Sequence, residues 1–383
     1  MGERYGVIVI GAGSVGSAAA YHLAARGQRV LVLERFAVPH TMGSHHGAHR
    51  IYRFAYAEGS SYVPLMRSAL ERWLALEAEW GEPLHRRTGG LDIGPPDSDQ
   101  VSGALASCRV HGLDHEVLDA EAVHERFPAW HLGDGVVAVH QPEAGMVFPE
   151  RCVAAHVAGA LRRGAEVRAL TQVLGWDSDG DGVVVHTDEG DDRRQHRADR
   201  LVIAGGAWLP QLVPSLAPLL RPTRQLVCWF TAVPATQFAP SAFPVWIAEV
   251  DEGHFYGFPE AVTPGVKIGW HEPGPSFDPD TPDRSTSAAD ETAHRRFVRR
   301  YLPGADGPTL ARGACLYTMS PDEHFIFDAL PGAPQVVVFG GDSGHAFKFA
   351  SELGAIAADL AIDGSTSADI TAFRLDRFDQ PTS

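Results

Sequence analysis

The first 34 residues hold the feature that most restricts how this chain can fold. A continuous apolar run at residues 7–10 is followed by three glycines in the pattern GxGxxG. The pattern then predicts a helix that extends to about Arg26, where Gly27 suits the left-handed position at its end. A second apolar run at residues 30–33 ends at Glu34. This order of strand, glycine turn, helix, strand and acid predicts a dinucleotide-binding βαβ unit.

Each part of this unit has a physical role in holding a dinucleotide. Gly11 permits the tight turn, Gly13 lets a pyrophosphate approach the backbone, and Gly16 lets the helix pack against the strand. The helix N-terminus faces the phosphates, and Glu34 accepts hydrogen bonds from a ribose. The pattern does not distinguish FAD from NAD, because both carry an adenosine ribose.

Two later segments have the pattern of further parts of the same domain. Residues 198–210 predict a buried strand, and residues 335–364 predict a strand, a glycine turn and an amphipathic helix. Shorter alternating runs between them, such as 245–250, indicate antiparallel strands. We predict an α/β fold in which an inserted, mainly antiparallel β domain covers the ligand crevice of a discontinuous Rossmann-like domain. The predicted boundaries are 1–85, 146–215 and 311–383 for the nucleotide domain, and 86–145 and 216–310 for the substrate domain.

Charge and cysteine content exclude several functional classes. The formal net charge of −16 opposes binding to nucleic acid, and more weakly to anionic membranes, because both need clustered Lys and Arg. No apolar run reaches the roughly 20 residues of a membrane-spanning helix, and no signal-peptide pattern precedes the first strand. The four cysteines form no CxxC pair, which argues against a zinc ribbon and a disulfide scaffold. We expect a cytoplasmic protein that binds neither nucleic acid nor membrane.

Cationic side chains gather soon after the second predicted strand. They are His40, His45, His46, His49, Arg50 and Arg53. The segment could form a metal site, a polar loop, or a cationic wall against a flavin or a substrate carboxylate. We predict no metal site, because no carboxylate or cysteine lies nearby and two arginines would repel a cation. On a helical turn, Arg50 and Arg53 would share a face because they are three residues apart.

Two lysines and a cysteine are further candidates for a site. On a strand, Lys267, Gly269 and His271 would point to one face, and the glycine would leave open space between the two polar side chains. Lys348 lies where a glycine turn becomes a helix. Cys315 lies in the stretch RGACLYTM, where its simplest interpretation is a small buried hydrophobic residue.

Taken together, these motifs resemble one family. The chain resembles the monomeric sarcosine oxidases and N-methyl amino acid oxidases, flavoproteins of the glycine-oxidase-like group. The resemblance covers nearly the whole chain through the motifs GAGSVG, PHTMGSHHGAHRIYR, YGFP, VKIGWH, CLYTMSPDEHFIFD and SGHAFKF. The glycine motif is common to many flavoproteins, whereas the histidine–arginine, cysteine and SGH–FKF motifs are specific to this family.

The resemblance implies FAD as the cofactor and a role for Cys315, whose thiol would form a thioether to the 8α-methyl group of FAD. Neighbouring cations would lower the pKa of this thiol and stabilise negative charge on the flavin ring. Arg53 and Lys348 match the pair that grips the substrate carboxylate. Lys267 matches the lysine that activates O₂, where a cation stabilises superoxide-like charge.

Other positions of the family also match this chain. His271 and Tyr256 match positions near the substrate amine. His46 and Arg50 match cations against the flavin face. Tyr317 and His345 match further active-site positions. The matching FAD contacts are Gly11, Gly13, Gly16, Glu34, Arg35, Ser44, Val173 and Gly344.

The chain departs from the family pattern at four positions. Ala48 and His49 replace an expected Asp and Thr, Asp342 replaces an aromatic residue, and Ile247 replaces a Met. Because Asp342 adjoins the SGH motif, we expect it to place negative charge near the substrate pocket. Such a charge would select a substrate with an additional cationic or polar group.

The predicted function is therefore that of an FAD-dependent amine oxidase. It would oxidise the C–N bond of a secondary, N-methyl amino acid to an imine and reduce O₂ to H₂O₂. An oxidase of a cyclic amino acid is the alternative. More distant possibilities are an NAD-linked dehydrogenase and a flavin-loaded sensor without turnover. The expected partners are a small amino acid and O₂, and the expected state is a monomer.

Overall fold

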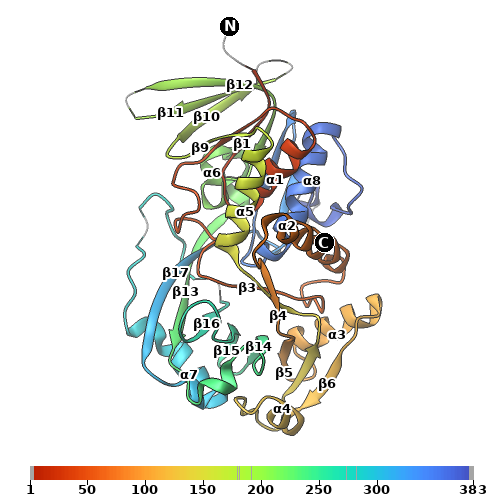
Figure 1. The fold of residues 1–383 in the computed structure, drawn as a ribbon, viewed down its shortest axis with the longest axis vertical. Coiled ribbons are helices and arrows are strands. Elements are labelled where there is room, and N and C mark those ends of the chain that lie inside the picture. Colours follow the sequence, from red (N-terminus) through yellow and green to blue (C-terminus); the bar gives the residue numbers. More distant parts are fainter. Residues whose placement is uncertain are drawn as a thin grey trace.

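Two large β-sheets form the two ends of an elongated molecule (Figure 1). The computed structural model describes residues 4–378 except 179, 181, 191, 273 and 282. A three-stranded sheet between the two ends pairs β3 (Arg50–Tyr52), β8 (Gly145–Val147) and β4 (His85–Arg87). The predicted fold class, an α/β nucleotide sheet combined with a mainly antiparallel sheet, is confirmed.

The first sheet is built on the predicted βαβ unit. β1 (Arg4–Ile10) pairs in parallel with β2 (Val30–Leu33) and β12 (Arg193–Ile203), and Ile10 lies opposite Leu33. Every residue of β2 is buried, as expected for an apolar strand that is covered on both faces. The other strands of this sheet are β9 (Glu166–Arg168), β10 (Gln172–Ser178), β11 (Val183–Asp188), β18 (Ile326–Leu330) and β19 (Ala333–Gly340).

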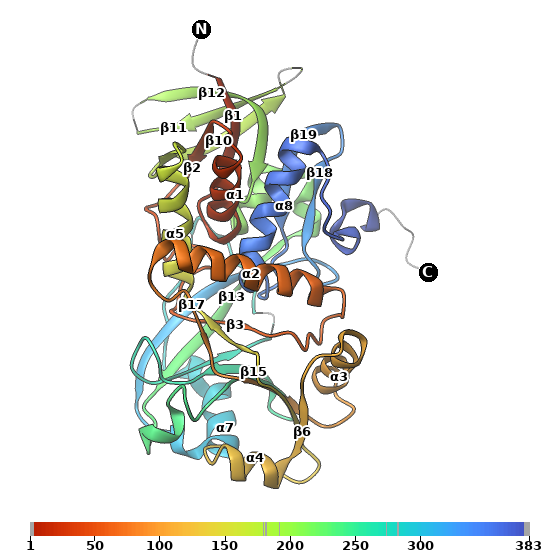
Figure 2. The ribbon, with the colours of Figure 1, turned by 45° about the vertical axis from the view of Figure 1, so that its right-hand side comes forward.

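Four helices pack against this sheet and against one another. α1 (Ser14–Ala25) lies between α5 (Pro149–Arg162) and α8 (Ala350–Asp363), and α2 (Tyr62–Trp80) crosses their ends (Figure 2). α1 and α8 approach so closely that a Cβ on Gly354 would lie 2.3 Å from the Cβ of Ala18. This contact holds the N-terminus of α1 in place at the carboxyl end of β1.

The second sheet is mainly antiparallel. Its strand order is β17-β13-β16-β15-β14-β5-β7-β6, and among these described neighbours only β14 and β5 pair in parallel. In that order the strands span Thr309–Met319, Arg221–Phe230, Val266–Trp270, Gly253–Phe258, Val245–Val250, Gly90–Gly94, Val137–Gln141 and Glu116–Asp119. The remaining α-helices described are α3 (Asp99–His111), α4 (Ala120–Arg126), α6 (Leu209–Leu212) and α7 (Thr292–Tyr301).

One predicted domain boundary falls inside a long strand. The boundary at residue 311 would divide β17, which pairs along its length with β13 in the second sheet. These two long strands reach from the second sheet towards the first (Figure 1). β17 therefore belongs to the second sheet, and its last residues carry the chain to the place where the two sheets meet. The boundaries after residues 85 and 145 likewise fall inside β4 and β8, and the division into domains stays a prediction.

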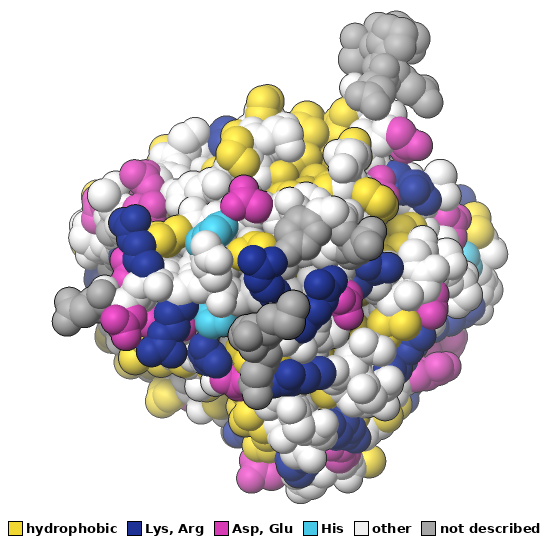
Figure 3. All heavy atoms as spheres, turned by 90° about the horizontal axis from the view of Figure 1, so that it is seen from above, with side chains coloured by type: hydrophobic (Ala, Val, Ile, Leu, Met, Phe, Trp, Pro, Cys, Tyr) yellow, Lys and Arg dark blue, Asp and Glu magenta, His cyan; other side chains and the backbone are white. Residues whose placement is uncertain are grey.

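The cations of the surface are arginines. Figure 3 shows them over the end of the molecule formed by β10 to β12, where Arg193, Arg194 and Arg197 are exposed. Lys267 and Lys348 are the only two lysines in the sequence, and both are buried. Among the residues described, no helix is long and apolar enough to cross a membrane.

A buried histidine of α7 makes the fold sensitive to acid. His294 is 0% exposed, and burial lowers its pKa from about 6.5 to about 4. The unfolded chain binds this proton more readily, so the free energy of unfolding should fall as the pH drops below about 6.5. We expect a loss of about 3 kcal/mol from this residue by pH 4. Urea unfolding of the wild type and of His294→Leu between pH 4 and 7 checks this; an identical pH slope in both proteins would contradict it.

Candidate active site

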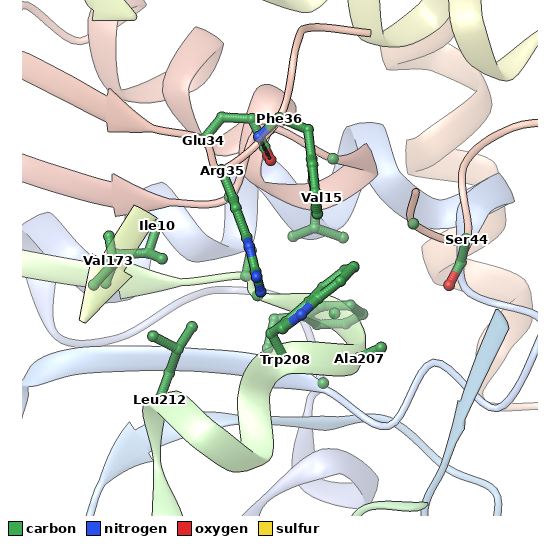
Figure 4. Close-up of a pocket in the computed structure, with 18 of the residues that line it drawn as sticks. Ile10, Val15, Glu34, Arg35, Phe36, Ser44, Val173, Ala207, Trp208 and Leu212 are labelled. Atoms are coloured by element: carbon green, nitrogen blue, oxygen red, sulfur yellow. Dashed lines mark hydrogen bonds between the residues drawn. The ribbon is translucent and has the colours of Figure 1, made fainter. Parts of the chain in front are cut away.

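A long cavity opens at the carboxyl ends of β1 and β2. Its volume is about 240 Å³. Val173 and Ser44 lie on opposite sides of it, and Trp208 and Arg35 line the wall between them (Figure 4). Ligands of open α/β sheets bind in this position, beyond the carboxyl ends of the strands. Of the predicted FAD contacts, the cavity is lined by Gly11, Gly13, Glu34, Arg35, Ser44 and Val173.

The glycine turn fits a dinucleotide for reasons that the structure makes explicit. Gly11 has a φ of +96°, a conformation that side-chain-bearing residues rarely adopt. A Cβ on Gly16 would lie 1.9 Å from the carbonyl oxygen of Gly11, so this glycine lets α1 pack on the turn. Gly13 starts α1 without a side-chain cap, which leaves the helix N-terminus available for phosphate. Gly16 itself does not line the cavity and acts on the packing alone.

Glu34 connects the second strand to the glycine turn. Its Oε2 accepts a hydrogen bond of 2.7 Å from the backbone N–H of Ala12, and its Oε1 accepts one of 2.9 Å from that of Phe36. The carboxylate is buried at the edge of the cavity, where the sequence predicted a ribose acceptor. Arg35 leaves the same strand end, pairs with Asp280 and lies over the ring of Trp208.

A second, smaller cavity of about 70 Å³ lies between the two sheets. It brings together most of the predicted catalytic and substrate-binding residues from segments far apart in the sequence. The predicted residues that line it are Arg50, Arg53, Tyr256, His271, Cys315, Tyr317, Gly344, His345 and Lys348. Arg50 connects the two cavities, because its guanidinium donates to the backbone oxygen of Ser44 at 2.6 Å.

Arg50 and Arg53 do not lie on a helical turn, so the shared face that such a turn would give them does not arise. Arg50 starts β3, whose backbone is extended because it pairs with Met146 and its neighbours in β8. The guanidinium of Arg50 donates to three backbone oxygens, of Ser44, His46 and His49, at 2.6–2.7 Å. Both arginines nevertheless line the second cavity.

Arg53 is already paired with a carboxylate of the protein. Its Nη2 donates to both carboxylate oxygens of Glu58 at 2.8 and 2.6 Å, and its Nη1 donates to the backbone oxygen of Ala55 at 2.6 Å. Its Nε is buried without a partner. Lys348 Nζ donates to the hydroxyl of Tyr56 at 3.2 Å and to the backbone oxygen of His345 at 3.0 Å. The two cations thus lie at one end of the cavity, over the same tyrosine ring.

Lys267 is buried beneath the histidine–arginine segment. Its Nζ donates to the backbone oxygens of Gly47 at 2.7 Å and His49 at 3.1 Å, and lies 4.8 Å from the ring centre of Phe258. Burial and the charge of Arg50 lower its pKa to about 7. The space expected beside Gly269 is filled, because a Cβ there would lie 2.2 Å from the ring of Tyr256.

Cys315 differs from the other cysteines in its electrostatic surroundings. Burial alone would raise its pKa, but His46, Arg50 and Lys267 lower it to about 6. Burial instead raises the pKa of Cys228 to about 12, and it also raises the pKa of the other two cysteines. All four are buried and free, so position among cations distinguishes this thiol.

The histidines around the second cavity are neutral at physiological pH. Burial lowers the pKa of His271 to about 3 and that of His345 to about 4. His271 Nδ1 lies 3.2 Å from the hydroxyl of Tyr317, and His345 Nδ1 lies 2.6 Å from that of Tyr56. These neutral imidazoles add no positive charge to a cavity that already holds buried cations.

Sequence reasoning missed three residues of this cavity and its surroundings. Glu58 and His254 line it, and Asp92 lies behind Arg53. A lone acid in the apolar strand GLDIG was an available signal for Asp92. The presence of only two lysines in the whole chain was another unused signal, because it marks Lys267 and Lys348 as exceptional.

The expected position of Asp342 is wrong. The residue lines the first cavity instead of the second, and its Oδ1 accepts hydrogen bonds from the backbone N–H groups of Gly344 at 3.0 Å and Thr318 at 3.3 Å. These bonds hold the carboxylate at the first cavity. Of the other departures from the family pattern, Ile247 lines the second cavity, and His49 is buried and accepts a hydrogen bond from Lys267 on its backbone oxygen.

Comparisons with known proteins agree with this arrangement. The family model described as FAD dependent oxidoreductase matches residues 6–360. The chain is 38% identical to a monomeric sarcosine oxidase of Bacillus sp. (strain NS-129), over 98% of each chain. It is 40% identical to that of Streptomyces avermitilis, over 97% of each. It is 37% identical to the N-methyl-L-tryptophan oxidase of Salmonella dublin, over 98% of this chain and 100% of the relative.

The chain is also similar to the solved structure of the open form of NikD, an unusual amino acid oxidase essential for nikkomycin biosynthesis. The two superpose with a TM-score of 0.84 at 29% sequence identity, and the match covers 97% of this chain and 98% of the NikD chain. The matches extend over both sheets and both cavities, and they confirm FAD rather than NAD as the dinucleotide. On this evidence, the chain belongs to the family of FAD-dependent oxidoreductases that contains the monomeric sarcosine oxidases and the N-methyl-L-tryptophan oxidases.

Proposed function

We propose that this enzyme oxidises the C–N bond of a small secondary amino acid, with an N-methyl amino acid as its substrate and O₂ as the electron acceptor. The observation that carries the proposal is the second cavity, which is lined by three cations, three histidines and Cys315. Bound FAD supplies the two-electron chemistry that yields an imine and H₂O₂. Relatives at 37–40% identity with such activities support the reaction class.

Arg53 and Lys348 would bind the carboxylate of the substrate. Arg53 keeps an unpaired Nε donor, and Glu58, which now occupies its Nη2, has a side chain that is 31% exposed. A substrate carboxylate could therefore replace Glu58 as the anionic partner of the guanidinium. Burial and the charge of Arg53 lower the pKa of Lys348 to about 7, so its contribution should weaken as the pH rises above that value.

The size of the second cavity supports a small substrate. At about 70 Å³ it is much smaller than the first, and it meets a wider outer cavity of about 750 Å³. The two cavities share the lining residues Glu58, His254, His271, Tyr317 and His345, and we assign these residues to the entrance of the site. A substrate would enter past them and release Glu58 from Arg53.

Replacing either carboxylate-binding cation should weaken substrate binding more than the chemical step. For Arg53→Met and Lys348→Met we expect KM to rise roughly 10- to 100-fold, because each removes a charge-assisted hydrogen bond in a buried site. Peroxide production with sarcosine measures this. An unchanged KM in both variants would contradict the carboxylate-binding role.

A substrate panel separates the two candidate classes. Peroxide formation is measured with sarcosine, N-methyl-L-alanine, L-proline and L-pipecolate at equal concentrations. The proposal expects the N-methyl compounds to react with the higher kcat/KM and to release formaldehyde. Faster reaction of the cyclic compounds without formaldehyde would favour the cyclic amino acid alternative, and no peroxide with any of them would contradict both.

Several finer features belong to the proposal as well. The roles of His46, Arg50, Tyr256, Tyr317, His271 and His345 at the flavin face and the amine, and those of Arg35, Ser44, Val173 and Gly344 as FAD contacts, are assigned through the family resemblance. A cytoplasmic monomer is expected on the same ground. Light scattering of the purified protein tests the oligomeric state.

A further inference from the structure

A buried acid lies behind the proposed carboxylate-binding arginine. Asp92 is the central residue of β5 and is 2% exposed. Its Oδ1 lies 3.6 Å from Arg53 Nη1 and accepts a hydrogen bond of 2.5 Å from Gln100 Nε2 at the start of α3. Gln100 is itself held, because its backbone N–H donates to Glu249 at 2.8 Å.

The alternation of β5 explains why the acid faces Arg53. Leu91 and Ile93 belong to the apolar core of the second sheet, so Asp92 points to the opposite face. An ionised carboxylate is costly to bury unless it is paired and hydrogen-bonded. The neighbouring guanidinium and the amide of Gln100 supply both kinds of contact, and the backbone of a central strand prevents the acid from moving away.

Arg53 therefore faces two carboxylates of different mobility. Glu58 lies on a loop with a side chain that is 31% exposed, whereas the side chain of Asp92 is 3% exposed. A substrate that displaces Glu58 would still find Asp92 next to the guanidinium. With Asp92 ionised, the net positive charge offered by Arg53 and Lys348 is reduced.

We propose that Asp92 is a positioning residue of the carboxylate site, which holds Arg53 through its contact with Nη1 and, when ionised, weakens the attraction of Arg53 for the substrate carboxylate. This inference rests on the proposed function, because it requires Arg53 to bind that carboxylate. It assigns the strength and the pH dependence of substrate binding to a residue that does not line the substrate cavity.

The charged and titratable groups that act on Asp92 make this a pH-dependent effect. Burial raises its pKa to about 6, Arg53, Gln100 and Lys348 oppose that rise, and Glu58 adds to it. The thiol of Cys108 also lies within its electrostatic range. Carboxylate binding should therefore be strongest below about pH 6 and weaken as Asp92 ionises. The deprotonation of Lys348, whose pKa is about 7, should weaken it further at higher pH.

The test compares a charged and an uncharged probe on the FAD-loaded enzyme. Calorimetry measures the Kd of propionate and of propionamide between pH 5 and 9 for the wild type and Asp92→Asn. Asparagine keeps an oxygen acceptor for Gln100 and Arg53 but removes the charge. We expect Asp92→Asn to bind propionate roughly three- to tenfold more tightly at pH 8, to match the wild type at pH 5, and to leave the Kd of propionamide unchanged.

Two further variants keep the inference falsifiable. Asp99→Asn, next to Gln100 and exposed, removes the same charge and should change neither Kd. Gln100→Leu removes the hydrogen bond that favours the ionised form, so the lower pH step of propionate binding should move to higher pH. Weaker propionate binding in Asp92→Asn, equal changes for both probes, or an unmoved step in Gln100→Leu would overturn the inference.

Arg53→Met separates this inference from the proposed function. If Arg53→Met binds propionate as tightly as the wild type does, the carboxylate site itself is misplaced and both fail. If Arg53→Met weakens propionate binding while Asp92→Asn has no effect, the proposed function stands and only the role of Asp92 is wrong.

Discussion

We predict that Cys315 holds FAD covalently, as the family resemblance implies, so that Cys315→Ala should release its FAD on denaturation and the wild type should not. His46, Arg50 and Lys267 lower the pKa of this thiol to about 6, so most of it is thiolate at neutral pH. Joining the thiolate to the 8α-methyl group would break one C–H bond of that group, release its proton and pass two electrons to the flavin. O₂, the acceptor in the proposed activity, would take up these electrons and become H₂O₂. Mass spectrometry of the acid-denatured protein measures the attached mass.

The chain provides a matched control for this prediction. Cys228 lies on β13, the strand that pairs with β17, and burial raises its pKa to about 12. Cys228→Ala should retain FAD on the peptide that contains Cys315. Covalent FAD that persists in Cys315→Ala, or a wild-type chain of unmodified mass after loading with FAD, would contradict the attachment site. Attachment during reconstitution should also slow as the pH falls through about 6, because the thiolate is then protonated.

Lys267→Met should slow reoxidation of the reduced enzyme by O₂ roughly 10²- to 10³-fold. The ammonium group is buried, hydrogen-bonded to two backbone oxygens, and close to Arg50 and Cys315. A preorganised cation in this position would stabilise the charge that forms when an electron passes to O₂. Because the pKa of Lys267 is about 7, the wild-type reoxidation rate should fall as the pH rises above that value.

The only other lysine of the chain is the control. Stopped-flow absorbance follows anaerobic reduction by substrate and reoxidation by O₂ as separate half-reactions. Lys267→Met should leave reduction nearly unchanged, whereas Lys348→Met should impair substrate binding and leave reoxidation nearly unchanged. Equal slowing of both half-reactions in Lys267→Met would mean that this lysine has no specific role in the reaction with O₂.

Local patterns predicted the nucleotide-binding half of the fold correctly. The βαβ unit depends on features that a short segment contains in full. Examples are the apolar run of β1 and Gly16, where a Cβ would clash with the carbonyl oxygen of Gly11. The mainly antiparallel character of the second sheet was also predicted correctly, from short alternating runs such as residues 245–250. The boundary predicted at residue 311 falls inside β17. Local patterns do not show how far this strand extends, because its pairing with β13 is a contact between distant segments.

Side-chain directions at the site were less predictable. The spacing of Arg50 and Arg53 would put them on one face of a helical turn, but the pairing of β3 with β8 makes the start of this segment extended. Asp342 was expected at the substrate pocket, but its hydrogen bonds to Thr318 and Gly344 hold it at the first cavity. Spacing along the chain does not contain these partners, which come from other strands.

The sequence by itself determined the dinucleotide site, the fold class and the candidate residues. Glycine spacing, apolar runs and specific motifs are each contained within a short stretch of the chain, so they can be recognised without the tertiary structure. Only the tertiary structure decided which charges meet. Asp92 and Glu58 reach Arg53 from β5 and from the loop before α2, and three cations surround Cys315 from different segments. Electrostatic interactions depend on distance and burial in space, so the pKa of Cys315 and the charge balance of Arg53 appear only when the two sheets are placed together.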